Sequence, residues 1–383
     1  MKKRILSILL LCCMVLTMLP TTASAAETGA MDNIPAKFDV EIDLCGRTSD
    51  INIKDSKTYY IYSSSSDPDF VWTKKIQING KKAAPHIFLD NVNIQVNKDA
   101  KTPAIELHGK ASAYLYFINR DSKLTGGGGR AAIQKNRSEG QLCVQVMRGT
   151  TVTCQGGYSG AGIGGSYAIR YFGTTYYNID MYGHGVNMHF GSQTNPSLWS
   201  GTIIAKGGKY SAGIGGGKNS SGATNIEITG DALVSAGSSG SAAIGSGESS
   251  TGETTINIHD TNPEKGVKSA FAYGGAGIGS GRYAKGKTYV TISNASVSTL
   301  ETPAASTNTS GAGIGTGAAI GSGSEGDVFS PPTGDPNTFK TIIRITDSNV
   351  TASSGPSAAI GSGSYSTNAT EIHINGGKIE ASN

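Results

Sequence analysis

A short glycine-rich unit, Ala-(Gly/Ala)-Ile-Gly, recurs along the chain and constrains the fold more than any other feature. Ile133 and Ile163 are 30 residues apart, as are Ile214 and Ile244. A repeat of roughly 20 to 50 residues is the signature of a solenoid or a related array, in which each unit completes the core of its neighbour. The copies of the unit begin at Ala161, Ala212, Ala242, Ala276, Ala312, Ala318 and Ala358.

Two further segments accompany each unit. An alternating strand follows the isoleucine, as in Ile226-Glu227-Ile228 and Ile256-Asn257-Ile258. Alternation of apolar and polar residues is typical of a strand with one buried face. A third short strand then comes at Val234, Val297, Val350 and Ile379. One cycle is therefore expected to contain three strands and three turns.

This pattern predicts an all-β fold, a right-handed parallel β-helix of about ten three-strand coils. Helical repeats are excluded because no segment long enough for a helix has 3.6-residue periodicity. We expect the β-helix to occupy residues 87–383, preceded by a linker and cap at 26–86. The chain stops directly after the third strand of a cycle, without an atypical terminal repeat, which predicts truncation at the C-terminus.

The first 25 residues have the pattern of a secretory signal peptide. Three basic residues precede an apolar run from Ile5 to Leu19, and Ala23-Ser24-Ala25 is a small-x-small cleavage site. The apolar run is too short for a membrane span. We therefore expect a secreted or extracellular protein, either free or attached to the bacterial cell surface. It is not expected to insert into a membrane.

Charge and cysteine content exclude two classes of protein. The leader holds three of the 32 Lys and Arg residues, which leaves 29 against 28 Asp and Glu. Without a basic run, nucleic acid is excluded as a partner. Two of the five cysteines lie in the leader; the three that remain, Cys45, Cys143 and Cys154, are an odd number, and no disulfide framework is expected. Strand alternation predicts that Cys154 faces the core and that Cys143 faces outward as an exposed thiol.

The repeat resembles the carbohydrate-binding β-helix domains on exported proteins of clostridia and related gut bacteria, which belong structurally with pectate-lyase-like folds. Residues 87–383 carry the resemblance through Ala-Gly-Ile-Gly-x-Gly alternating with x-Ile-x-Ile-x. It implies binding of plant or microbial cell-wall polysaccharide, sometimes with calcium. No ligand-contacting residue of the family is matched position by position.

An acidic column is expected at the turn between the second and third strands. Turns favour Asp and Asn because their side chains bond the backbone, so we favour this reading over a string of calcium sites. Binding of Ca²⁺ along the column stays the alternative, and no other cofactor is expected. The metal ligands and catalytic residues stay unassigned, and His184 and His189 offer only a weak metal motif. The column contains Asp90, Asp231, Asp260, Asn294, Asp347 and Asn375.

The repeat is interrupted once, where Ile163 and Ile214 are 51 residues apart. The insertion at 166–200 is rich in aromatic residues, and sugars present apolar C–H faces that stack on such rings. An equally weighted alternative is that the rings hold the loop on the rod. Asn178-Ile179-Asp180-Met181 is expected to be the second strand of this coil. The candidate ligand contacts are Tyr176, Tyr177, Tyr182 and Trp199.

Three functions follow from these patterns. The leading hypothesis is an adhesin-like, polysaccharide-binding β-helix module without catalysis. The first alternative is a calcium-dependent polysaccharide lyase or a glycoside hydrolase, which requires carboxylates that converge on one face. The second alternative is a structural stalk on the cell surface. Fold alone does not decide among them.

Overall fold

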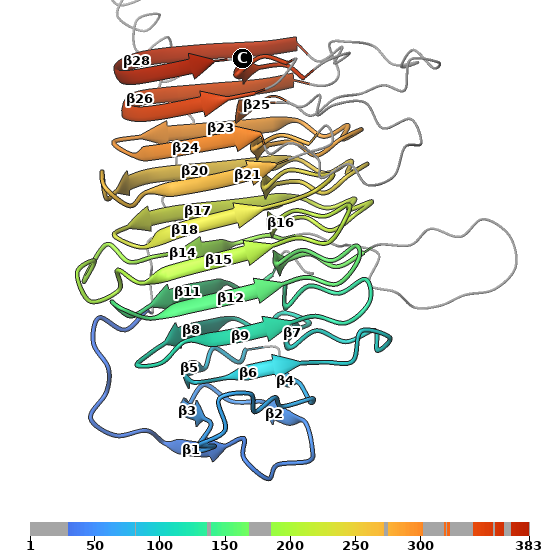
Figure 1. The fold of residues 1–383 in the computed structure, drawn as a ribbon, viewed down its shortest axis with the longest axis vertical. Helices are drawn as coiled ribbons and strands as arrows, with labels where there is room; N and C mark the ends of the chain where they lie inside the picture. Colours follow the sequence, from blue (N-terminus) through green and yellow to red (C-terminus); the bar gives the residue numbers. More distant parts are fainter. Residues whose placement is uncertain are drawn as a thin grey trace, which may run out of the picture. The chain divides into compact units, whose positions relative to one another are not determined.

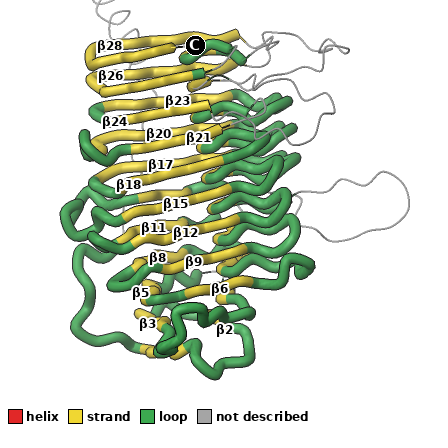
Figure 2. The backbone as a smooth tube through the Cα atoms, viewed as in Figure 1, coloured by secondary structure: helices red, strands yellow, loops and turns green. Residues whose placement is uncertain are grey.

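The computed structural model describes residues 30–80, 82–135, 139–167, 185–271, 275–301, 318, 320–321, 340–354, 357–363 and 369–382. Within these ranges the chain consists of strands, turns and loops, with no helix (Figure 2). All the strand pairs are parallel, and the coils lie one above another (Figure 1). The predicted all-β parallel β-helix is confirmed.

The first strand of each coil lies in a ten-stranded sheet, the first ladder. Most of its strands are only two to four residues long, because the chain turns sharply around a single inward isoleucine. They are β2 (Ile51–Ile53), β4 (Ile76–Asn79), β7 (Ile105–His108), β10 (Ile133–Lys135), β13 (Ile163–Gly164), β16 (Ile214–Gly215), β19 (Ile244–Gly245), β22 (Ile278–Gly279), β25 (Ile320–Gly321) and β27 (Ile360–Gly361).

The second and third strands form two ladders within an 18-stranded sheet. The second ladder holds β1 (Val40–Asp43), β3 (Thr58–Tyr62), β5 (His86–Asp90), β8 (Ala113–Phe117), β11 (Leu142–Val146), β14 (Met188–Phe190), β17 (Thr224–Gly230), β20 (Thr254–Thr261) and β23 (Thr288–Ser293). The third ladder holds β6 (Asn93–Gln95), β9 (Ser122–Thr125), β12 (Thr151–Gln155), β15 (Thr202–Lys206), β18 (Leu233–Gly237), β21 (Val267–Phe271) and β24 (Ser296–Glu301). Both ladders include β26 (Lys340–Ser353) and β28 (Ala369–Ser382).

The core is a set of stacked apolar columns. In the first ladder Ile133, Ile163, Ile214 and Ile244 pair in register, and each is fully buried. Burial of one such side chain contributes about 1.5 to 3 kcal/mol. Because the register places like residues on like residues, the core continues from coil to coil without a break.

The ladders also include the region before the repeat. β1 pairs with β3 and β3 with β5, while β2 pairs with β4 and β4 with β7. Residues 31–38, the N-terminal strap, lie against the outward face of the second ladder. There the Met31 backbone N–H donates to the Tyr116 hydroxyl at 2.7 Å, and the Phe38 ring stacks on Tyr60 at 4.9 Å.

Two local expectations are wrong. The second strand after β13 is β14, Met188–Phe190, and not Asn178-Ile179-Asp180-Met181, which lies outside the described residues. The reason is that the Met188 and Phe190 side chains are both buried and in register with β11 and β17. Cys143 belongs to an outward column but is only 2% exposed, and its register partner His189 is buried as well, so alternation along the strand does not report exposure here. Cys154 is buried in the core, as expected.

From β13 onward, a glycine follows the inward isoleucine of the first ladder, and the stacking distance requires it. Gly215, Gly245 and Gly279 have φ values of 133°, 139° and 141°, a conformation that L side chains rarely adopt. A β-carbon added to Gly245 would overlap the carbonyl oxygen of Gly279 in the next coil. The repeat is therefore glycine-rich because successive backbones approach too closely for a side chain.

We expect Gly245→Ala to destabilise the protein by roughly 3 kcal/mol, because it combines backbone strain with a collision against backbone atoms. Gly109→Ala is the matched control, since Gly109 also has positive φ, +67°, but an added β-carbon would have no atom within 4 Å. The control should cost about 1 kcal/mol. The measurement is the guanidinium midpoint of unfolding, and equal losses in the two variants would contradict the stacking argument.

Candidate functional site

Only one of the four predicted ligand contacts lies in the described part of the chain. Tyr176, Tyr177 and Tyr182 fall within 168–184, outside the described residues. Trp199 is fully buried, and its indole N–H donates to the Asp32 carbonyl at 3.3 Å. Its ring lies 5.2 Å from that of Tyr116. In this position Trp199 fixes the N-terminal strap, and its ring faces are not available to stack on a sugar.

Trp199 belongs to an aromatic stack that sequence reasoning did not identify. The rings of Phe88 and Tyr116 are 4.5 Å apart, and those of His86 and Tyr114 are 4.7 Å apart. These residues project outward from β5 and β8, which are in register. The sequence contains alternating aromatic residues in this region. Sequence alone did not show that they stack, because this depends on the register between β5 and β8. Because the strap packs on the stack, we interpret the stack as structural.

An aromatic pair with one exposed and one half-buried ring lies elsewhere, at the turns between the third and first ladders. Tyr158 follows β12 and Tyr210 follows β15 in the next coil. Their ring centroids are 5.7 Å apart and nearly perpendicular, at 84°. Tyr158 is 61% exposed, which makes it the one aromatic among the large exposed hydrophobic residues of the described chain. We call Tyr158, Tyr210, Lys209 and Lys218 the tyrosine patch.

Two lysines give the tyrosine patch a positive character. The ammonium nitrogens of Lys218 and Lys209 lie 3.8 and 5.2 Å from the Tyr210 ring centroid, within the range of cation–π attraction. A hydrogen bond with Lys209 lowers the pKa of the Tyr210 phenol. Lys218 also pairs with Glu248 at 3.0 Å. The patch therefore combines two aromatic rings, set edge to face, with cationic donors beside them.

The insertion begins on the same column of turns. The Tyr167 backbone N–H donates to the carbonyl of Gly129 at 2.9 Å. Gly129 lies in the turn between β9 and β10, which corresponds to the Tyr158 turn one coil later. Gly157, beside Tyr158, approaches the Gly127 carbonyl closely, so the two turns are stacked. The predicted insertion at 166–200 thus starts next to the tyrosine patch.

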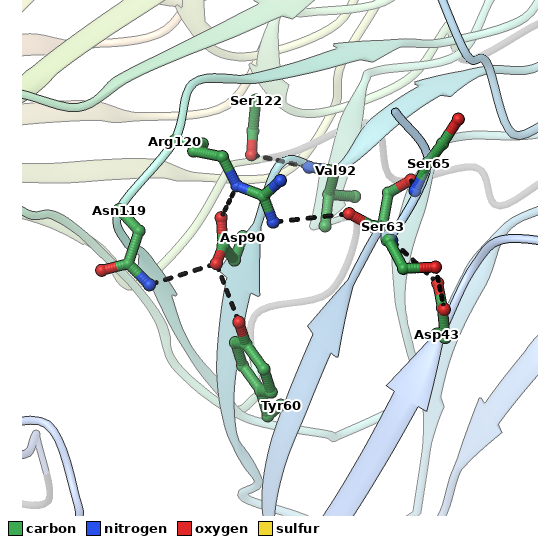
Figure 3. Close-up of polar contacts among 10 residues, drawn as sticks. Asp43, Tyr60, Ser63, Ser65, Asp90, Val92, Asn119, Arg120 and Ser122 are labelled. Atoms are coloured by element: carbon green, nitrogen blue, oxygen red, sulfur yellow. Dashed lines mark hydrogen bonds and ion pairs between the residues drawn. The ribbon is translucent and has the colours of Figure 1, made fainter. Parts of the chain in front are cut away.

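The acidic column acts in turn formation. Asp90 is 4% exposed and accepts hydrogen bonds from Arg120 Nε at 2.8 Å, Tyr60 Oη at 2.8 Å and Asn119 Nδ2 at 3.1 Å (Figure 3). Burial alone would raise the Asp90 pKa, but these three hydrogen bonds lower it. With both oxygens engaged by donors, this carboxylate is a poor calcium ligand.

Other members of the column adopt the left-handed conformation that such turns require. Asp260, Asn294 and Asp347 have φ values of 50°, 47° and 46°. The Asn294 side-chain amide donates to Asp260 Oδ1 at 2.8 Å, and this hydrogen bond joins two adjacent coils. Among the residues that the structure describes, no three His, Cys, Asp or Glu side chains are arranged to hold a metal ion. The left-handed backbone and the hydrogen bond between coils favour the turn interpretation of the column.

A row of ionisable side chains crosses the outward face of the second ladder. Glu227 Oε2 lies 2.8 Å from His189 Nδ1, and Glu227 Oε1 lies 2.9 Å from His259 Nε2. Burial would raise the Glu227 pKa, but hydrogen bonds from the two imidazoles outweigh it and lower the pKa to about 2. The hydrogen bond to Glu227 raises the His259 pKa, and Asp260, 3.0 Å from His259 Nδ1, adds to the effect.

No family model, no curated protein and no solved structure matches the chain. The part of the chain that the structure describes contains no helix with the length and apolar character of a membrane span.

We expect the Glu227 row to make stability depend on pH in two windows. The lowered pKa of Glu227 stabilises the fold above about pH 4.5, and this contribution, roughly 3 kcal/mol, is lost as pH falls toward 2. The raised pKa of His259 stabilises the fold below about pH 6.5 and is lost as pH rises through the folded-state pKa.

Glu227→Gln should lower the melting temperature at pH 5 to 6. It should also make the melting temperature vary less with pH, both in the acidic window of Glu227 and in the window of His259. Glu253→Gln, which neutralises an exposed carboxylate on the approach to β20, is the matched control and should leave the profile unchanged. The measurement is thermal melting across pH 2 to 9. An unaltered profile in Glu227→Gln would show that the row does not contribute to stability.

Proposed function

We propose that the chain is an exported, adhesin-like module that binds polysaccharide and does not turn it over. The observation that carries the proposal is the pair formed by the exposed Tyr158 ring and the half-buried Tyr210 ring, with Lys209 and Lys218 beside it. Aromatic rings stack on the apolar faces of sugars, and nearby polar groups orient the hydroxyls. The resemblance of the repeat to clostridial carbohydrate-binding β-helices leads to the same ligand class.

The β-helix suits this function because it repeats its surface. Tyr158 and Tyr210 occupy successive turns of a stacked column, so equivalent positions recur about every 4.8 Å along the rod. A polymer with a regular repeat can then contact several turns at once, and weak contacts add together. Tyr176, Tyr177 and Tyr182 remain proposed contacts on the insertion that begins beside this column.

Export and display at the cell surface are part of the proposal. They rest on the sequence of residues 1–25, where a basic segment, an apolar run and Ala23-Ser24-Ala25 follow in the order of a signal peptide. Polysaccharides of plant or microbial cell walls lie outside the cell that would export the protein. Compartment and ligand therefore agree with each other.

The double variant Tyr158→Ala and Tyr210→Ala is expected to weaken glycan binding roughly tenfold or more, because each ring contributes on the order of 1 kcal/mol of stacking. Tyr289→Ala, which removes a partly exposed ring from β23 on another face, is the matched control and should bind normally. The assay is a glycan array with calcium and with chelator, followed by calorimetry on the best ligand.

A second variant, Tyr176→Ala with Tyr177→Ala and Tyr182→Ala, tests the insertion separately. Loss of binding in both variants would indicate that the tyrosine patch and the insertion contribute to a single glycan-binding site. If no plant or microbial polysaccharide binds the wild-type chain, the stalk becomes the better account. If soluble sugar is released from pectin, the lyase or hydrolase alternative replaces the binding module.

A further inference from the structure

A second pair of a cation and a tyrosine ring lies farther along the rod than the tyrosine patch. The Arg282 guanidinium carbon is 4.4 Å from the Tyr283 ring centroid, within the range of cation–π attraction, and the guanidinium also donates to the Tyr283 hydroxyl. Both side chains are half-buried. In the tyrosine patch Lys218 lies over the ring of Tyr210 in the same manner. One combination of groups thus occurs at two places on the rod.

The two cations occupy the same position of the repeat. Lys218 comes four residues after Ile214, and Arg282 comes four residues after Ile278. Ile214 and Ile278 are equivalent residues of the first ladder, and one coil lies between theirs. The two cations are therefore two coil steps apart, roughly 10 Å along the rod.

Backbone hydrogen bonds make the surface between the two pairs continuous. The Glu248 N–H donates to the Tyr210 carbonyl at 3.1 Å, and the Asn219 N–H donates to the Glu248 carbonyl at 2.8 Å. The Ser249 N–H then donates to the Arg282 carbonyl at 2.8 Å. The turns that follow β16, β19 and β22 are thus stacked directly on one another.

Tyr283 adopts a backbone conformation that a tyrosine rarely takes. Its φ is 57°, in the left-handed region, and the equivalent residues of the two preceding coils, Asn219 and Ser249, have φ values of 59° and 57°. Asn tolerates this conformation, whereas a bulky aromatic residue pays for it in conformational energy. An unfavourable backbone conformation of this kind is typical of functional positions. The ring of Tyr283 is therefore placed where the turn itself favours a small polar residue.

We propose that Arg282 and Tyr283 form a second glycan subsite, and that the ligand is an extended, linear polysaccharide lying along the rod axis and reaching both pairs. The proposal rests on the proposed function, because the tyrosine patch is its first subsite. Two 1,4-linked sugar rings in an extended chain cover about the same length as two coils. Equivalent rings of such a polymer therefore meet equivalent cations of the rod.

Each pair offers the same two kinds of contact to a sugar. The tyrosine supplies apolar area and a hydroxyl, and the cation supplies N–H groups for the sugar oxygens. Because the ring restrains the cation beside it, less conformational freedom is lost when the sugar binds. A polymer bound at one pair reaches the other within the same complex, so the two weak contacts reinforce each other.

The test is calorimetric titration with linear β-1,4-linked gluco-, xylo- and manno-oligosaccharides of two and of six units. A disaccharide is long enough for one pair, whereas a hexasaccharide reaches both. We expect the wild-type chain to bind at least one hexasaccharide roughly tenfold or more tightly than the matching disaccharide. Arg282→Ala should remove most of this preference.

Tyr283→Asn separates a binding role from a structural one. The variant introduces the residue that Asn219 already provides at the equivalent position, so the guanidinium midpoint of unfolding should be equal to or higher than that of the wild type. The preference for the hexasaccharide should nevertheless disappear. Lys285→Ala is the matched control, since it removes a charge from an exposed side chain of the same turn, and it should keep the preference.

The possible outcomes distinguish this proposal from the proposed function. Equal affinity for the two lengths in the wild type, or an undiminished preference in folded Tyr283→Asn and Arg282→Ala, would overturn the second subsite and leave the tyrosine patch in place. Binding of branched or compact glycans alone, found on the glycan array, would overturn the linear ligand class. Absence of binding to any glycan would overturn both proposals.

Discussion

The structure depends on parallel, in-register stacking of one coil on the next at about 4.8 Å. Every other feature of the chain adapts to this distance. The isoleucines of the first ladder fall on one another, and Gly245 is a glycine because its backbone nearly touches Gly279. The left-handed turn residues, such as Asn294, recur because each coil must leave the second ladder in the same way. No coil is stable alone, since its backbone donors and acceptors are completed by its neighbours.

The same stacking decides where chemistry can arise. Outward side chains at equivalent positions form columns, so residues 30 to 50 positions apart in the sequence become contacts. Phe88 and Tyr116 become an aromatic stack in this way, and Cys143, His189 and Glu227 become a row of ionisable groups. Outward residues in such columns can be as buried as the core, as Phe88 and Cys143 are, so strand alternation alone did not predict the exposure of Cys143.

The architecture could be predicted because it is written locally in the repeat. Ile133, Ile163 and Ile214 specify both the strand and its register, and the structure pairs them as expected. The candidate sites could not be predicted in the same way. His189 belongs to β14 because its neighbours Met188 and Phe190 fill the core, and the interrupted repeat concealed that alignment. Trp199 is a residue type that often contacts sugars, but the N-terminal strap covers it. The strap lies outside the repeat, so the repeat pattern could not predict this contact.

The two surfaces also place different demands on the rod. At the tyrosine patch the rings extend from turns, where side chains can change without loss of the core, and this suits a binding surface that must fit a polymer. At Glu227 the hydrogen-bonded side chains, His189 and His259 included, rise from strands, so the backbone ladder fixes their geometry. A solenoid can thus carry an adaptable surface at its turns and fixed hydrogen-bonded rows on its faces, because the same coil sets the distance between neighbours in both.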